Sequence, residues 1–513
     1  MKKTFLILVL TVAMYVQVIS QTVNGLIVSD TNNITVVKLW GTSEERGFAY
    51  GYLMGYKLDS AFKKWVLPFY GNSYQTVREL IQQVTSIVID TVYQNEAKAV
   101  IEGMDSAGYN NAGYDYLDIL AGGIWEDMGN WPLLKKKDSW NCSAFMNWND
   151  TTAGTDLNGC SVMSHHLDWY YIPEHCFYTG SIIVHIPSEE DQQPWLMVDF
   201  AGYIAPGHGC NQSGYSMATD GLSGVGNPDT TNTSYTPFRF MMRNVLETTD
   251  YNQDGEYNMH DIREAISDQE QGYIGGSIFS ALGPSTAIHD SMIALVAEVA
   301  PDNPVITFRT NSYEDTIPGD NLYAANSPIA RNNARQYCTR YLAMVDTIGD
   351  GTNIGSEANW EMMRVHSNGG LGNLVFMQFI PEWSQLKLSF CRKINGTIYP
   401  AYLVEPQIFN LDSLFALPPW VAVNHQGQPS IEMNLSPNPF TELSDIRYRI
   451  PDAGFVSVRV FDFSGNEVRV LAGEKQSAGE HEVRFDASDL PAGIYIIRLQ
   501  AGSESVTMKI VKL

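Results

Sequence analysis

The stretch that decides the fold is residues 140–169, which opens with Trp-Asn-Cys-Ser-Ala-Phe and closes with His-His-Leu-Asp-Trp. Strand-like runs at 143–148 and 160–164, separated by turn-rich residues, predict a hairpin that returns Asp168 to the side of Cys142. A nucleophilic cysteine needs a nearby base and a group that orients it. If the chain is cut before Cys142, the new α-amino group, whose pKa is about 7.7–8.0, supplies that base.

The regions around this hairpin alternate between the two periodicities of regular structure. Helical spacing occurs at 74–89, 97–104, 235–247 and 262–266, and strand-like runs occur at 181–185, 195–200, 374–379 and 385–391. Most of the strand pairs adjoin in sequence. We therefore expect antiparallel sheets flanked by helices, an α+β body from about residue 25 to residue 412.

The N-terminus reads as a targeting segment. Lys2 and Lys3 precede an apolar run over residues 5–14, which predicts a secretory signal peptide, residues 1–20, cut before Gln21. This run is too short to span a bilayer, and no later stretch reaches about 18 uncharged apolar residues. We expect an exported protein without a transmembrane segment.

The C-terminus predicts a separate small domain. Residues 413–433 are rich in turn and breaker residues, as in a linker. Short alternating strands follow at 446–450, 456–461 and 493–499, with turn signals between them. This spacing predicts an Ig-like β-sandwich over residues 434–513.

Three motifs of this tail resemble a known family. They are Ser-Pro-Asn-Pro-Phe at 436–440, Val-Arg-Val-Phe-Asp at 458–462 with Gly465 after it, and Leu-Pro-Ala-Gly-Ile-Tyr at 490–495. They are similar to the C-terminal sorting domain of type IX secretion substrates. The resemblance implies export to the cell surface or the medium and a partner in the type IX machinery. The alternative is an accessory module with no sorting role.

Composition excludes several classes of protein. Lys plus Arg number 32 against 57 Asp plus Glu, which gives a net charge of −25. Such a chain is repelled by phosphate backbones, so we expect no nucleic-acid partner. With 44% hydrophobic residues the chain can bury a large core, and six cysteines in 513 residues are too few for a disulfide scaffold.

Residues 250–261 have the pattern of an EF-hand calcium loop. Oxygen-bearing side chains occupy positions 1, 3, 5, 9 and 12, Gly255 stands at position 6, and the carbonyl of Glu256 serves position 7. Asp at position 12, in place of Glu, resembles dockerin loops and predicts a structural Ca²⁺ site. The alternative is an acidic helix–helix turn without metal. The predicted ligands are Asp250, Asn252, Asp254, Glu256, Asn258 and Asp261.

Motifs along the whole body resemble the peptidase C45 and acyl-coenzyme A:6-aminopenicillanic acid acyltransferase family. The family belongs to the N-terminal-nucleophile hydrolases, as do choloylglycine hydrolases and acid-ceramidase-type amidases. The matching segments, in chain order, are Gly-Thr-Ser-Glu-Glu-Arg-Gly at 41–47 with Gly51 and Gly55, Cys-Ser-Ala-Phe at 142–145, Leu-Asp-Trp at 167–169, Gly-Cys-Asn-Gln-Ser-Gly at 209–214, Arg-Asn-Val-Leu-Glu at 243–247 and Ala-Asn-Ser-Pro at 325–328.

The resemblance implies a fold and a mechanism. The body would be a four-layer αββα structure, cleaved between Asn141 and Cys142 into chains of residues 21–141 and 142–412. Cys142 would be the nucleophile and Asp168 would hold its α-amino group. Asn326 would donate to the oxyanion, with Asn211 as a possible second contributor.

Further down the chain, Arg340, with Arg335 as the alternative, would support Cys142 or a charge on the substrate. Close members of the family carry arginine three residues before the aspartate, where this chain has His165, and this departure bears on substrate choice. The implied activity is hydrolysis of a small linear acyl-amide, or acyl transfer, through a thioester acyl-enzyme without an organic cofactor.

Other interpretations of the same residues stay open at this point. Cys142 could belong to a disulfide, and Asn326 before Ser-Pro could be only a turn residue. His165 and His166 could bind zinc, although neighbouring strand residues point to opposite faces. At the level of function, the alternatives are a phospholipase-B-like lipid hydrolase of the same fold, or a non-catalytic, calcium-stabilised surface binding protein.

Overall fold

The structure is a computed structural model, and it divides into two compact units, residues 1–411 and residues 412–513. It describes residues 22–83, 87–129, 142–169, 172–222, 225–226, 228, 234–269, 272–285, 292–310, 317–331, 338–366, 372–418, 421, 432–450, 453–462, 467–501 and 504–513. The predicted signal peptide, the residues flanking the predicted cleavage site on its N-terminal side, Arg335 and most of the predicted linker lie outside these ranges.

One large sheet runs through the first unit. Its strand order is β1-β2-β5-β6-β7-β8-β9-β10-β11 within the described residues, and every neighbouring pair is antiparallel except β2 and β5. The strands are β1 (Gly25–Thr31), β2 (Ile34–Gly41), β5 (Gly180–Pro187), β6 (Trp195–Phe200), β7 (His208–Asn211), β8 (Ser216–Gly221), β9 (Ser277–Leu282), β10 (Ala294–Val299) and β11 (Ile306–Thr310).

A second antiparallel sheet carries the hairpin predicted at residues 140–169. Its order is β12-β3-β4-β13-β14-β17, as far as the chain is described. The strands are β12 (Asn321–Ala325), β3 (Ser143–Asn147), β4 (Val162–Asp168), β13 (Asn373–Ile380), β14 (Gln385–Phe390) and β17 (Gln407–Asn410), followed after β14 by a short ribbon of β15 (Arg392–Ile394) and β16 (Thr397–Tyr399). Ser143 pairs with His166 and Ala325 pairs with Ser143, so β3 lies between β12 and β4.

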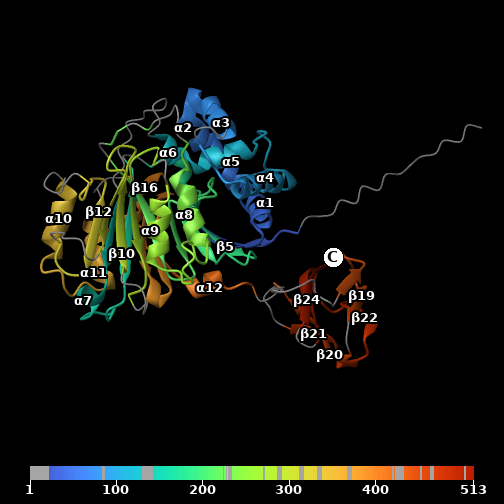
Figure 1. Cartoon of the computed structure of the whole chain (residues 1–513). Helices are drawn as coiled ribbons and strands as arrows, with labels where there is room; N and C mark the ends of the chain where they lie inside the picture. The colour runs from blue at the N-terminus through green and yellow to red at the C-terminus, as the bar shows by residue number, and fades with distance from the viewer. Residues whose placement is uncertain are drawn as a thin grey trace, which may run out of the picture. The chain divides into compact units, whose positions relative to one another are not determined.

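Contacts place the two sheets against each other. The rings of Phe200 on β6 and Phe390 on β14 lie 5.2 Å apart, and Arg309 on β11 donates to the carbonyl of Tyr323 on β12 at 3.0 Å. Helices α8 (Phe238–Glu247) and α9 (Met259–Ser267) pack on the larger sheet, and α10 (Thr339–Ile348) and α11 (Ser356–His366) pack on the smaller one. Figure 1 shows α8 and α9 in front of the strands, with α10 and α11 at the opposite side.

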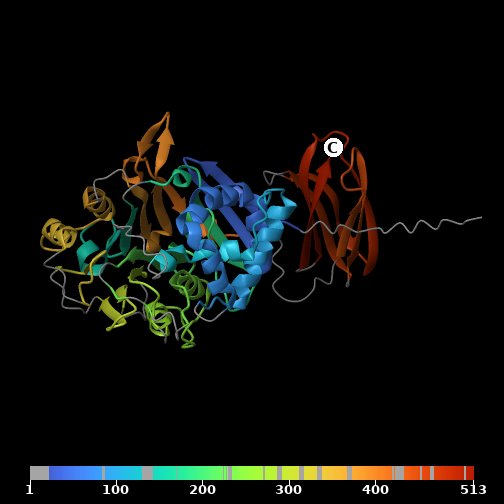
Figure 2. The same ribbon diagram turned by 90° about the horizontal axis from the view of Figure 1, so that it is seen from above.

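The N-terminal helices form a separate group beside β1 and β2. They are α1 (Ser43–Ala61), α2 (Leu67–Tyr70), α3 (Tyr74–Gln83), α4 (Thr91–Ser106), α5 (Tyr116–Gly123) and α6 (Trp125–Gly129), and short helices α7 (Asn149–Thr152) and α12 (Leu411–Phe415) lie further along the chain. Figure 2 shows the blue-to-cyan group apart from the yellow helices.

Helices α1 and α4 approach each other very closely because glycines face the contact. A Cβ on Gly51 would lie 1.9 Å from the carbonyl oxygen of Val100, and one on Gly103 would lie 2.1 Å from that of Phe48. Only glycine permits this backbone separation. The glycine spacing in the Gly-Thr-Ser-Glu-Glu-Arg-Gly motif and after it is thus explained by helix packing.

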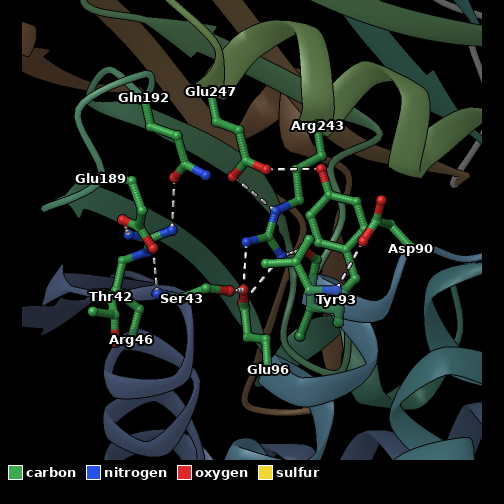
Figure 3. A network of polar contacts seen from close by, with 12 residues as sticks. Thr42, Ser43, Arg46, Asp90, Tyr93, Glu96, Glu189, Gln192, Arg243 and Glu247 are labelled. Carbon is green, nitrogen blue, oxygen red and sulfur yellow. Dashed lines mark hydrogen bonds and ion pairs between the residues drawn. The ribbon is translucent and has the colours of Figure 1, made fainter.

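Two sequence motifs meet in a buried polar network that joins α1, α4 and α8 (Figure 3). Arg243 donates to Glu96 and Glu247, and Glu96 also accepts from the hydroxyl of Ser43 at 2.6 Å. Arg46 donates to Glu189 at 2.8 Å. Each buried charge has a charged partner, which removes the cost of burying it alone.

The C-terminal unit consists of two antiparallel sheets around one apolar core. The strand orders, within the described ranges, are β18-β19-β22 and β21-β20-β23-β24. Their bounds are β18 (Glu432–Ser436), β19 (Leu443–Ile450), β20 (Gly454–Asp462), β21 (Glu467–Gln476), β22 (Gly479–Asp486), β23 (Gly493–Ala501) and β24 (Glu504–Lys512). Val458, Ile497 and Phe485, drawn from both sheets, are fully buried in the core.

The predicted mixture of helices and sheets is confirmed in the first unit, and the strand-rich tail is confirmed in the second. Helix α3 ends at Gln83, whereas the periodicity had extended to residue 89. Strand β4 runs from Val162 to Asp168, so the second strand of the predicted hairpin continues past the 160–164 run to the aspartate. Among the described residues, no helix is both long enough and apolar enough to cross a membrane.

Candidate functional site

Cys142 lies directly before β3, at one end of the smaller sheet, and it is buried. Burial raises the pKa of its thiol well above the usual range. A hydrogen bond from the backbone of Asp168 lowers the pKa of this thiol. In the uncut chain the thiol is therefore protonated, and it needs a base before it can attack.

Asp168 is the last residue of β4 and lies beside Cys142, as the hairpin predicted. Its Oδ1 accepts a hydrogen bond from Nδ2 of Asn373 at 2.5 Å. Asn373 is the first residue of β13, which pairs with β4, and its own Oδ1 accepts from the backbone of Tyr402. The carboxylate is thus held by a side chain that is itself fixed.

Asn326 and Arg340 complete this group. Asn326 follows the last residue of β12, and its Nδ2 donates to the carbonyl of Gly221 at 2.6 Å. Arg340 donates through Nη1 to the carbonyl of Cys142 at 3.0 Å and through Nη2 to Oδ1 of Asn326 at 2.6 Å. The four neighbouring strands β12, β3, β4 and β13 therefore gather Asn326, Cys142, Asp168 and Asn373 at one edge.

The structure does not bring Asn211 to this edge. Asn211 ends β7, next to Ser216, whereas the contact with Asn326 is made by Gly221 at the other end of β8. Its Oδ1 accepts from the backbone of Tyr215 and so closes a turn. This geometry does not support the expectation that Asn211 assists Asn326.

His165 and Asp220 form a buried pair between the two sheets. Nε2 of His165 lies 2.8 Å from Oδ1 of Asp220, and the ring of His165 lies 4.7 Å from that of His208. His166 points to the other face, where its ring meets Phe376. The two histidines therefore cannot share a metal ion, as the strand geometry predicted.

Aromatic side chains pack around Trp169, the residue that follows Asp168 in the chain. The ring of Trp65 lies 4.8 Å from that of Trp169 and 5.3 Å from those of Trp125 and His175. Trp125 precedes Glu126, which pairs with Arg239 at 2.9 Å. These four rings are buried, and they lie next to the ion pair of Glu126 and Arg239.

Sequence reasoning did not identify Asn373 or Asp220 as members of the site. Asn373 directly precedes the predicted strand at 374–379. Its place in the site follows from the pairing of that strand with β4, which the sequence does not reveal. Asp220 comes from the facing sheet, and no local pattern marks it. All six cysteines are described, and none forms a disulfide.

Residues 250–261 link α8 to α9 as a tight loop. Asp250 accepts from the backbone of Asp254 and Gly255 at 3.1 and 2.8 Å, and the side chain of Asn252 donates to Asp254 at 3.0 Å. Gly255 has φ +98, as its sharp turn requires. Asn258 is the N-cap of α9. These features fit positions 1, 3, 5, 6 and 9 of a calcium loop.

Position 12 is used differently. Both oxygens of Asp261 accept backbone hydrogen bonds, from Tyr251, Asn252 and Asn258 at 2.6–3.2 Å. In the described part of the chain, no three His, Cys, Asp or Glu side chains converge as a metal site. Calcium would therefore compete with the helix cap for Asp261.

Comparisons with known proteins identify the C-terminal unit first. Residues 434–513 match the family described as the secretion system C-terminal sorting domain. The predicted sorting domain is thus confirmed, and the chain is a secreted or surface-attached protein. No match was found among curated proteins.

Solved structures similar to this chain include two hydrolases. One is an N-acylethanolamine-hydrolyzing acid amidase ortholog from Caenorhabditis elegans, with 14% identity, a TM-score of 0.33, and coverage of 47% of this chain and 93% of that chain. The other is a mutant conjugated bile acid hydrolase from Clostridium perfringens, with 10% identity, a TM-score of 0.34, and coverage of 53% and 94%.

Proposed function

We propose that the body is a self-processing cysteine amidohydrolase with the αββα layers of the N-terminal-nucleophile class. The observation that carries the proposal is the meeting of Cys142, Asp168 and Asn326 at the ends of three neighbouring strands. Such a group contains a nucleophile, a carboxylate to orient its base and a donor for an oxyanion. The sorting domain supports a site of action outside the cell.

In the proposed reaction, cleavage before Cys142 creates an α-amino group on the nucleophile itself. This amine takes the proton of the thiol, and the thiolate attacks the carbonyl carbon of a linear amide. Asn326 already donates one hydrogen to Gly221, and its Nδ2 carries a second that is suited to the oxyanion. The ammonium then returns the proton to the leaving amine, and water or another amine accepts the acyl group from the thioester.

Arg340 contributes to the site through Asn326 and Cys142. Its guanidinium donates to Oδ1 of Asn326, which turns the Nδ2 end of the amide away from Arg340. It also donates to the carbonyl of Cys142, which fixes the start of β3. We assign it a positioning role in the proposed mechanism.

Self-cleavage is the decisive test. N-terminal sequencing and intact mass of the purified protein should show one chain beginning at Cys142 and another ending at Asn141. Cys142→Ala should abolish cleavage, and Cys210→Ala, which removes a buried thiol from β7, should not. An intact chain in the wild-type protein would refute the proposal.

A further inference from the structure

A second buried carboxyl group, that of Asp220, lies on the facing sheet beside the candidate site. Asp220 lies on β8 and its side chain is fully buried. The next residue, Gly221, accepts a hydrogen bond from Asn326 of the candidate site at 2.6 Å. Oδ1 is engaged by Nε2 of His165, but Oδ2 is buried without a hydrogen-bond partner among the described residues. Burying an acceptor of this kind costs free energy unless another group donates a hydrogen bond to it.

The proposed mechanism supplies such a group. A neutral amine that acts as a base has two N–H bonds and one lone pair, so the lone pair points at the thiol only if both N–H bonds are directed elsewhere. Asp168 offers one acceptor at the end of β4. A second acceptor has to approach from a different side, and the end of β8 in the facing sheet already contacts the site, where Gly221 accepts from Asn326.

We propose that Oδ2 of Asp220 accepts a hydrogen bond from the α-amino group of Cys142 after cleavage, and that His165 is a positioning residue that keeps Asp220 turned toward it. This inference rests on the proposed function, because it requires a free amine on Cys142. The thiol proton still moves to the nitrogen lone pair, and Asp220 neither gains nor loses a proton.

The ionisation of the pair agrees with this role. Burial raises the pKa of Asp220 well above its usual range, and burial lowers the pKa of His165 to about 3. One proton on Oδ1 then donates to Nε2 of His165, and Oδ2 stays a carbonyl acceptor. The other charged groups around Cys142 are Asp168, Glu126 on α6 and Arg340 on α10.

The test uses the rate at which iodoacetamide alkylates Cys142 in the full chain, measured from pH 5 to pH 10. Mass spectrometry of the peptide that begins at Cys142 restricts the measurement to cleaved molecules, and no substrate is needed. Asp220→Leu removes the acceptor at similar size. It should disfavour the ammonium–thiolate form and slow alkylation at pH 7 about tenfold, which corresponds to one pKa unit.

Conservative variants separate this role from a general effect on packing. Asp220→Asn keeps a carbonyl acceptor and should retain the wild-type profile. His165→Gln can still accept the proton of Asp220 through its amide oxygen, whereas His165→Leu cannot and should slow alkylation as Asp220→Leu does. His166→Gln, an equally buried neighbour on the other face, is the control and should change nothing.

Two results would overturn the inference. If Asp220→Leu and His165→Leu both give the wild-type profile on cleaved chains, then Asp220 does not hold the amine, although the proposed function survives. If no peptide beginning at Cys142 exists in the wild-type protein, the inference and the proposed function fail together.

Discussion

Asp168 owes its orientation to Asn373, a residue 205 positions away in the chain. Because the carboxylate is held from one side by this amide, a substitution that keeps its shape tests its charge separately from its packing. Asn326 offers a parallel test of the oxyanion donor, since it is held by Arg340 and Gly221.

We predict that Asp168→Asn lowers kcat for an acyl-amide substrate by a factor on the order of 10², the usual effect of losing a positioned acid–base partner. Asn326→Ala should cost about 2.7–4 kcal/mol in the transition state and affect substrate binding less. Both are measured as kcat and KM on correctly cleaved protein. Near-normal turnover by both variants would show that the site is assigned to the wrong residues.

At the scale of single elements, the contact between α1 and α4 depends on backbone approach more than on side chains. A methyl group on Gly51 meets the carbonyl of Val100, which cannot move without unwinding α4. The higher helix propensity of alanine, about 0.5–1 kcal/mol, opposes this clash but is too small to offset it.

We therefore predict that Gly51→Ala destabilises the first unit by about 1–3 kcal/mol, the usual cost of overpacking. Gly129→Ala is the matched control, because the described residue nearest to its new methyl group would be Phe69, at 3.9 Å. Urea unfolding followed by circular dichroism measures both. Equal midpoints for the two variants would contradict the packing argument.

The loop between α8 and α9 carries the calcium proposal. Calcium that binds only the folded state should raise the melting temperature, with a stabilisation of about 2.7 kcal/mol at a hundredfold excess over Kd. Asp250→Ala should remove this effect, and Glu264→Gln, an exposed carboxylate of α9 outside the loop positions, should retain it. A melting curve that EDTA leaves unchanged, with metal removal verified, would speak against the site.

At the scale of the whole molecule, the first unit buries histidines in their neutral form. Burial lowers the pKa of His175 and of His208 to about 3, and it also lowers the pKa values of His166 and His185. The unfolded chain binds protons at these residues below about pH 6.5, whereas the folded chain does not. Acid therefore favours unfolding through each of them.

We predict that the buried histidines lower the free energy of unfolding as pH decreases from about 6.5 toward 4. His175 alone contributes a slope of about 1.4 kcal/mol per pH unit over most of that range. His175→Gln should remove its share and flatten the curve, even if the variant is less stable at pH 7. Urea titrations at several pH values test this, and parallel curves for the two proteins would exclude a titrating His175.

The local patterns of the sequence were sufficient to predict most individual elements, including β3, β4, β13 and α8, because each has a clear periodicity. They were also sufficient to place Asp168 beside Cys142, because one hairpin joins them. They could not predict that β12 pairs with β3, or that β2 pairs in parallel with β5, because these strands are distant in sequence. Asp220 and Asn373 could not be predicted as site residues for the same reason.

Cys142 stands directly before β3, while β1, β2 and the helices up to α6 precede it in the chain. A cut at this point would leave β2 paired with β5, so the two pieces would share one continuous sheet. The product would be a heterodimer with an enforced one-to-one stoichiometry, encoded by a single gene and insensitive to dilution. Neither piece could be exchanged without dismantling the sheet, so the two subunits would be produced together and degraded together.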